Sequence, residues 1–214
     1  MESTGRRPEH SGSGGRRGFV TARYDRRTAL LVVDVQNDFA DPAGSLYVAS
    51  GEEVVPRANA EIEGARAAGA LVVYTQDWHP AHTPHFAQDG GTWPVHCVAG
   101  TQGAAFHPGL RVEGEVVRKG EGGEDGYSAF SVRHPVSGEE SGTGLEELLR
   151  ARGIERVVIA GIATDYCVRE TALDALRLGF AAVVLRDAVR AVDLHAGDGD
   201  RALREVAEAG ASVE

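Results

Sequence analysis

The chain has 214 residues, 42 % hydrophobic and 25 % charged, which is enough to bury one ordinary hydrophobic core. Its net charge of −10 argues against general binding to nucleic acid or to an anionic membrane surface. Two cysteines are too few for a disulfide framework, and no run of about 18 apolar residues predicts a transmembrane helix. We therefore expect a cytoplasmic protein with free thiols.

The start of the chain, residues 1–27, is predicted to be a disordered or extended tail. Its first residues are rich in Gly, Ser and Arg and show no apolar periodicity. Arginine pairs are present, but no apolar segment follows them, so the segment lacks the pattern of a secretory signal. A single domain is expected to occupy residues 28–214.

From residue 28 onward, short apolar runs alternate with segments of helical periodicity. The run "ALLVVDVQ" is typical of a strand buried on both faces, and four more strands are predicted in "ALVVYTQD", "GEVVRKG", "RVVIAG" and "AAVVLRDAV". Helices are expected around residues 54–68, in "GLEELLRARG", after Cys167 and in "DRALREVAEAG". The final "ASVE" is expected to form at most a short sixth strand.

This alternation predicts an α/β fold. We expect a mostly parallel, doubly wound sheet of about five or six strands with helices on both faces. The stretch 79–114 has little regular pattern but holds aromatic residues and histidines. Because loops of this length in compact domains are commonly functional, we expect it to form part of a site.

Reactive side chains lie at or just after the ends of four predicted strands. Asp34 ends the first strand, Asp77 ends the second, Lys119 ends the third, and the fourth leads through a turn to Cys167. Parallel strands end at one edge of a sheet, where open α/β sheets bind ligands. Each residue has an ordinary structural alternative, such as a turn cap for Asp34, but their joint placement favours a reactive site.

Cys167 lies where a helix is expected to begin. The helix dipole and the charge of Lys119 would lower the pKa of a thiol there, although an inert core cysteine is the alternative. A nucleophile also needs a base and an oxyanion site, for which Asp34 and the N–H groups of the helix start are available. These are the parts of an acyl-transfer site. The other cysteine, Cys97, is expected to be structural.

Four of the eight histidines fall between residues 79 and 96. In an extended segment, Asp77 and His79 point to the same side, and His85 and His96 lie within reach of the same loop. A carboxylate with imidazoles suits a first-row divalent ion such as Zn²⁺, Fe²⁺ or Mn²⁺. Solvated loop histidines are the alternative.

Five blocks of the sequence, in their order, closely resemble nicotinamidase/pyrazinamidase, of the isochorismatase-like cysteine hydrolases. They are "LLVVDVQNDF", "DWHP…HF", "WPVHC", "RKG…DGYSAF" and "GIATDYCV". The resemblance covers roughly residues 28–214. It implies a metal-dependent amidohydrolase that converts nicotinamide to nicotinate and ammonia through a thioester, and that also accepts pyrazinamide.

The resemblance also implies roles for individual residues. The implied catalytic triad is Cys167, Asp34 and Lys119, and the implied oxyanion hole is formed by the N–H groups of Ala163 and Cys167, after a cis peptide bond at Ile162–Ala163. The implied ligands of one divalent metal ion are Asp77, His79 and His96, joined in some relatives by a residue at the position of His85. The implied ring-binding aromatic residues are Phe39, Trp93 and Tyr127.

Alternative functions fit the residues less well. A hydrolase of the same fold acting on another small amide or ureido substrate would not need the aromatic residues together with the metal set. An isochorismatase proper cleaves a vinyl ether without a cysteine nucleophile, so Cys167 argues against it. A non-catalytic metal-binding scaffold would not need all three triad groups. We expect a small-molecule substrate, nicotinamide, and no nucleic-acid or membrane partner. A homo-oligomer is left open.

Overall fold

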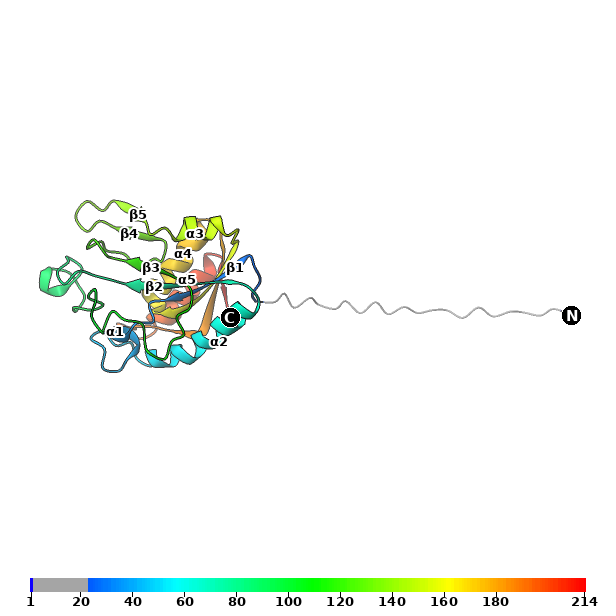
Figure 1. The fold of residues 1–214 in the computed structure, drawn as a ribbon, viewed down its shortest axis with the longest axis horizontal. Helices are drawn as coiled ribbons and strands as arrows, with labels where there is room; N and C mark the ends of the chain where they lie inside the picture. Colours follow the sequence, from blue (N-terminus) through cyan, green and yellow to red (C-terminus); the bar gives the residue numbers. More distant parts are fainter. Residues whose placement is uncertain (2–22) are drawn as a thin grey trace.

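A computed structural model describes residue 1 and residues 23–214. In this part of the chain, six parallel strands form one sheet in the order β3-β2-β1-β6-β7-β8 (Figure 1). Their bounds are Glu115–Lys119 for β3, Leu71–Asp77 for β2, Thr28–Val33 for β1, Arg156–Ile162 for β6, Ala181–Arg190 for β7 and Ser212–Val213 for β8. The predicted α/β sheet is confirmed, including its short sixth strand.

The central strands are buried because layers of helices and loops cover both faces of the sheet. All six residues of β1 are buried, and β1 pairs with β2 on one side and β6 on the other. Their aliphatic and β-branched side chains suit such positions, since they pack well on a pleated surface. This explains why the strands stand out in the sequence as continuous apolar runs.

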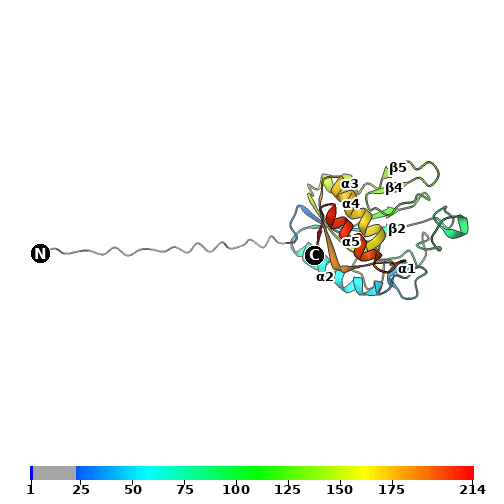
Figure 2. The same cartoon turned by 180° about the vertical axis from the view of Figure 1, so that it is seen from behind.

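Helices cover both faces of the sheet (Figures 1 and 2). Helix α2, Val54–Ala67, packs on one face. Helices α3, Leu145–Ala151, α4, Arg169–Arg177, and α5, Asp198–Glu208, lie on the other. The buried residues of α2 recur at helical spacing: Val54, Val55, Ala58, Ile62 and Ala65. Each face therefore has its own hydrophobic layer.

Several short elements were not predicted. An antiparallel pair joins β4, Ser131–Arg133, to β5, Glu140–Gly142, and a single helical turn, α1, spans Asn37–Ala40. Short 3₁₀ turns cover Gly51–Glu53 and Ala87–Asp89. Elements of three or four residues are too short to show a hydrophobic period, which is why their sequences read as loop.

The last residues of the predicted tail pack on the domain. Tyr24 is buried, and its hydroxyl donates a hydrogen bond of 2.6 Å to Glu61 on α2. Arg23 forms an ion pair with the same carboxylate. Residues 2–22 of the expected tail lie outside the described residues, so their disorder stays a prediction. Within the described part of the chain, every helix is too short or too polar to cross a membrane.

The segment 78–114 crosses the carboxyl edge of the sheet, as expected for part of a site. Gln36 anchors it, because its buried amide donates hydrogen bonds to the carbonyls of Asp77 (2.7 Å) and Ala104 (2.9 Å). The N–H group of His79 donates to the carbonyl of Cys97 (3.0 Å). These bonds bring both ends of the histidine-containing loop to the ends of β1 and β2.

Candidate active site

Lys119 lies at the centre of the four reactive side chains predicted to meet at the carboxyl edge. Its Nζ is 2.8 Å from Asp34 Oδ2, 2.9 Å from Asp77 Oδ1 and 3.6 Å from Cys167 Sγ. Parallel pairing explains part of this geometry, since Asp77 and Lys119 stand opposite each other in the β2–β3 register. All four side chains are buried, so their charges interact in a medium of low dielectric constant.

Asp34 is held in place by its backbone and by the neighbouring strand. Its φ of 48° bends the chain as β1 ends. Its Oδ1 accepts a hydrogen bond of 2.6 Å from the hydroxyl of Thr75 on β2, and the Asp34 N–H group donates to the same hydroxyl (3.2 Å). Thr75 thus leaves Oδ2 facing Lys119. Thr75 was not among the predicted site residues, because threonine is an ordinary strand residue.

The turn that leads to Cys167 begins with a glycine that no other residue can replace without a clash. Gly161 has a φ of +130°, and a Cβ there would lie 2.0 Å from the carbonyl oxygen of Val33 on β1. The peptide bond between Ile162 and Ala163 is cis, as the family resemblance implied. Strand β6 therefore approaches β1 closely just before the chain turns away.

Cys167 itself lies in a π-helical turn, Thr164–Val168, which continues into α4. The carbonyl of Ala163 accepts hydrogen bonds from the N–H groups of Tyr166 (3.1 Å) and Val168 (3.0 Å), the neighbours of Cys167 on both sides. This pattern fixes the turn and places the thiol at the floor of a pocket. π-Helical turns are common at functional sites.

Burial raises the pKa of both Asp34 and Cys167. For Asp34, the negative charge of Asp77 adds to this effect and Lys119 opposes it. For Cys167, Lys119 again opposes burial, but the carboxylates of Asp34 and Asp77 reinforce it, so the thiol pKa lies well above its ordinary value. The lowered thiol pKa expected from the sequence is therefore wrong, because burial and two carboxylates outweigh one ammonium group. The thiol keeps its proton until a base accepts it.

Lys119 stays protonated despite its burial. Burial alone would lower its pKa, but the carboxylates of Asp34 and Asp77 hold it well above the usual range. Its ammonium group also donates to the carbonyl of Tyr127 (3.1 Å). With this set of contacts, Lys119 is a fixed positive charge beside the thiol rather than a proton donor.

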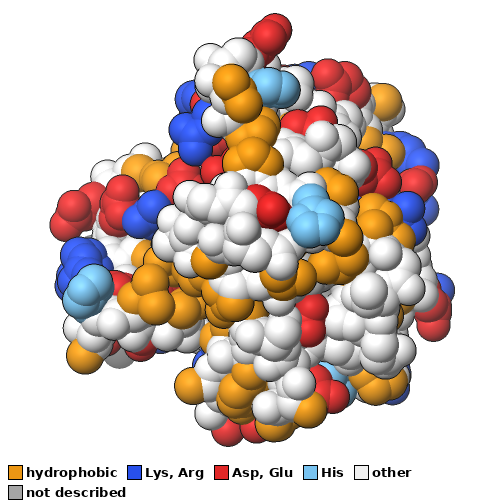
Figure 3. Space-filling model, turned by 90° about the vertical axis from the view of Figure 1, so that its left-hand side faces the viewer, with side chains coloured by type: hydrophobic (Ala, Val, Ile, Leu, Met, Phe, Trp, Pro, Cys, Tyr) orange, Lys and Arg blue, Asp and Glu red, His pale blue; other side chains and the backbone are white. Residues whose placement is uncertain are grey.

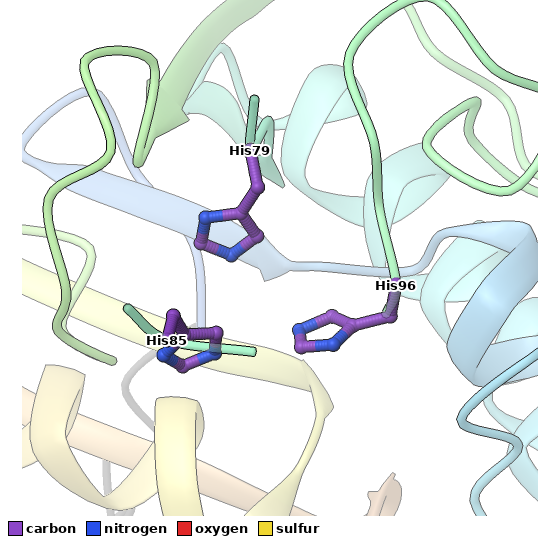
Figure 4. A group of neighbouring side chains, drawn as sticks. All are labelled: His79, His85 and His96. Atoms are coloured by element: carbon purple, nitrogen blue, oxygen red, sulfur yellow. The ribbon is translucent and has the colours of Figure 1, made fainter. Parts of the chain in front are cut away.

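Three histidines form a second cluster beside these residues (Figure 4). One ring nitrogen from each of His79, His85 and His96 lies within 4.8 Å of the others, and all three side chains are buried. Nδ1 of His85 is 2.8 Å from Asp125 Oδ1, and Nδ1 of His96 is 2.8 Å from the carbonyl of Pro94. These contacts leave Nε2 of both rings available as a metal ligand.

The donor atoms of this cluster fit a divalent metal ion. Both ring nitrogens of His79 are buried and have no hydrogen-bond partner among the described residues, an arrangement that is costly without a ligand. Burial lowers the pKa of His96 to about 4, so its imidazole is neutral at pH 7 and able to bind a cation. Three imidazole side chains suit zinc or another first-row ion.

Asp77 lies between the histidine cluster and the triad. Its Oδ2 is 3.8 Å from Nε2 of His79, and its Oδ1, although 2.9 Å from Lys119, has no aligned hydrogen bond. Burial would raise the pKa of Asp77, but Lys119 and His79 hold it below its usual range. The carboxylate is therefore ionised and able to face a metal ion as well as the lysine.

A pocket opens between Cys167 and the histidines. Its wall is aromatic, and all three predicted ring-binding residues, Phe39, Trp93 and Tyr127, line it. The indole N–H of Trp93 donates to the hydroxyl of Tyr127 (3.0 Å). Figure 3 views this edge of the molecule, where apolar side chains gather in the hollows between loops.

Tyr166 is a fourth aromatic residue of the wall and was not among the predicted site residues. Its ring centroid lies 5.0 Å from that of Trp93 and 5.2 Å from that of Tyr127. Being next to Cys167 was the signal that could have identified it, since a residue beside the nucleophile borders the same pocket. The four rings make the pocket suitable for a flat aromatic ligand.

Comparison with known proteins identifies the family. The family model of the isochorismatase domain matches residues 28–214. The chain belongs to the isochorismatase family. It is 38 % identical to the nicotinamidase of Escherichia coli over 203 residues, covering 86 % of this chain and 93 % of that protein. It is 42 % identical to the nicotinamidase/pyrazinamidase of Mycobacterium tuberculosis over 173 residues, with coverages of 79 % and 86 %.

Solved structures of this family share the fold. The crystal structure of PnC1 from L. infantum in complex with nicotinate aligns with a TM-score of 0.80 at 38 % identity, covering 88 % of this chain and 92 % of that one. The pyrazinamidase of Pyrococcus horikoshii in complex with zinc aligns with a TM-score of 0.79 at 41 % identity, with coverages of 88 % and 98 %.

The two thiols of this isochorismatase-family protein are expected to differ in reactivity. Cys167 lines the pocket and has Lys119 beside it, whereas Cys97 is fully buried in one of the two hydrophobic layers. Brief treatment with iodoacetamide followed by mass mapping should therefore label Cys167 faster. The reaction should accelerate with rising pH, because burial holds both thiol pKa values above the ordinary range. Preferential labelling of Cys97 in the folded protein would show that the wrong thiol has been assigned.

Gly120 is expected to be required for metal binding. A Cβ on this residue would lie 2.4 Å from Nδ1 of His79, so Gly120→Ala should displace the imidazole and weaken metal binding about 10–100-fold. Gly123→Ala is the matched control: Gly123 also has a positive φ, but its nearest atoms would lie 3.7 Å away. Zinc titration against a chromophoric chelator measures the zinc affinity of both variants. Equal affinities in the two variants would contradict a ligand role for His79.

Proposed function

We propose that this protein is a metal-dependent cysteine amidohydrolase that converts nicotinamide to nicotinate and ammonia and also hydrolyses pyrazinamide. One observation carries the proposal: the Cys167–Asp34–Lys119 cluster and the histidine cluster border one aromatic pocket. A carboxamide on a pyridine ring carries a scissile amide on one side and a ring nitrogen on another. The pocket offers a complementary group for each of them.

The first half of the reaction is acylation of Cys167. Asp34 accepts the thiol proton as sulfur attacks the amide carbon, and the N–H groups of Ala163 and Cys167 bind the developing oxyanion. Asp34 then donates that proton to the amide nitrogen as the carbon–nitrogen bond breaks. Ammonia leaves and a thioester remains. The raised pKa of Asp34 suits this role, because it brings the carboxyl group closer to an effective acid and base at neutral pH.

The second half is hydrolysis of the thioester. Asp34, again ionised, accepts a proton from a water molecule as the water oxygen attacks the carbonyl carbon. The thiolate then leaves and takes that proton from Asp34, which restores both groups. Lys119 remains 2.8 Å from Asp34 and 3.6 Å from Cys167. Its fixed charge stabilises the thiolate whenever that anion forms.

His79, His85, His96 and Asp77 are proposed to hold one divalent ion: zinc, iron or manganese. When bound, the ion supplies a Lewis-acidic position for the ring nitrogen of the substrate. His85 and His96 line the pocket together with Cys167, so one ligand can reach both clusters. The zinc complex of the Pyrococcus horikoshii relative supports zinc among these alternatives.

Release of ammonia and nicotinate in equal amounts from nicotinamide tests this function. Maleamate and ureidoacrylate are the competing substrates, since relatives that are 35 % and 34 % identical are named maleamate amidohydrolase and ureidoacrylate amidohydrolase. We expect hydrolysis of nicotinamide and pyrazinamide to exceed that of either aliphatic amide, which cannot fill an aromatic pocket. Turnover of the aliphatic amides alone would assign the enzyme to another branch of the family. The cytoplasmic location stays a prediction.

A further inference from the structure

Asp165 is a buried carboxylate two residues before the nucleophile that the reaction does not use. Only 6 % of its surface is exposed. Its Oδ1 accepts a hydrogen bond of 2.9 Å from the N–H group of Val192, and its Oδ2 accepts one of 2.9 Å from the N–H group of Asp193. The side chain therefore joins the turn that carries Cys167 to a segment more than 20 residues further along the chain.

That segment, residues 191–197, connects β7 to α5 and is called the strap here. Val192 is the strap residue that lines the pocket, together with Tyr166 and Ala163. The remainder of the strap is largely exposed. Without Asp165, the backbone N–H groups at its start would lose their acceptors in a part-buried position, and the strap would be free to move away from the pocket.

A second hydrogen bond continues the connection on the far side of the strap. Asp193 has a φ of 52°, and its Oδ1 accepts a hydrogen bond of 2.8 Å from the N–H group of Gly199 in the first turn of α5. Gly199 has to be small, because a Cβ there would lie 2.5 Å from the Cβ of Ala191. The start of the strap is therefore held on two sides, by Asp165 at the pocket and by the first turn of α5 through Asp193.

We propose that Asp165 is a positioning residue that holds the strap in place and so sets the width of the substrate pocket. Val192 is the strap residue that limits which substrate rings fit into this width. The proposal rests on the proposed function for the identity of the ring. The clamp itself is a property of the protein without substrate. The expected preference is for an unsubstituted pyridine or pyrazine ring over a methylated one.

Hydrogen exchange tests the clamp without any turnover. In Asp165→Ala, amides of the strap should exchange at least about 10-fold faster, while amides of β1 and β6 keep their protection. Asp165→Asn should give a smaller increase, because an amide oxygen can accept only one of the two N–H groups while its NH₂ group faces the other. Asp200→Asn is the control, since Asp200 lies next to Gly199 in the first turn of α5 but is exposed and pairs with Arg186. Unchanged strap exchange in both Asp165 variants overturns the clamp.

Kinetics with nicotinamide, 5-methylnicotinamide and 6-methylnicotinamide test the selection. Asp165→Ala should raise KM for nicotinamide about 10-fold with a smaller change in kcat, and should improve the relative kcat/KM of at least one methylated ring. Val192→Ala widens the wall without touching the clamp and should shift the preference in the same direction. The proposal is overturned if Asp165→Asn lowers kcat/KM equally for all three substrates and Val192→Ala leaves the ratio of kcat/KM between nicotinamide and the methylated rings unchanged. A wild-type enzyme inactive on nicotinamide would instead contradict the proposed function and leave the exchange result standing.

Discussion

Replacement of Cys167 by alanine is expected to lower kcat for nicotinamide by about 10⁴-fold or more, the scale seen when a catalytic nucleophile is removed. The variant loses the sulfur that lies 3.6 Å from Lys119 Nζ and borders the pocket. Fold and metal content should be retained, because the change removes a single small group. Steady-state ammonia release, circular dichroism and elemental analysis on one preparation measure the three properties.

Asp34→Asn should be nearly as damaging. The amide keeps the shape of the side chain and can still accept the hydroxyl hydrogen of Thr75, but it cannot accept the thiol proton. The variant also leaves Lys119 with one carboxylate partner instead of two. The negative charge of Asp34 raises the pKa of Cys167, so removing that charge should not raise this pKa further. A fall in kcat therefore reports the loss of the base.

Cys97→Ala supplies the matched control for these variants. Cys97 is a buried thiol of the hydrophobic layer, and its removal leaves the triad and its contacts intact. Its kcat should stay within a few-fold of wild type. Appreciable turnover by Cys167→Ala would contradict the assignment of Cys167 as the nucleophile, provided that mass spectrometry and active-site titration exclude contaminating wild-type enzyme.

The assembly of the site at one edge could be predicted because parallel topology fixes where strands end. Asp34, Asp77 and Lys119 each follow or end an apolar run, and parallel pairing places Asp77 opposite Lys119. The direction of the fourth strand likewise brings Cys167 to the same edge. None of these positions depends on details of side-chain packing, so an apolar pattern with the right strand polarity was sufficient.

The supporting residues could not be predicted in this way. Thr75, Asp125 and Asp165 make their contacts with residues that are 41, 40 and 27 positions away in the chain. Their sequence surroundings are those of an ordinary strand, loop and helix start. The pKa of Cys167 escaped prediction for a related reason: helix position is visible in the sequence, but burial and a third charged neighbour are not.

The choice of substrate gives the second large expected effect. Nicotinamide, pyrazinamide and benzamide share the same scissile carboxamide and nearly the same ring shape, so Cys167 and the aromatic wall meet them alike. Only benzamide lacks a lone pair on the ring. The histidine end of the pocket, formed by His85 and His96, then faces a C–H group instead of a nitrogen.

We expect kcat/KM for benzamide to be lower than for nicotinamide by a factor on the order of 10⁴. A site built around a polar contact rejects an analogue that lacks it far more strongly than an apolar pocket rejects a missing methylene, which costs only about 10–200-fold. The three amides should be compared on one zinc-replete preparation by ammonia release. In Gly120→Ala, where the imidazole of His79 has to move, the advantage of nicotinamide should shrink, whereas Gly123→Ala should preserve it. If benzamide turns over within a few-fold of nicotinamide in the wild-type enzyme, the histidine cluster does not select the ring, and the protein is a more general aromatic amidase.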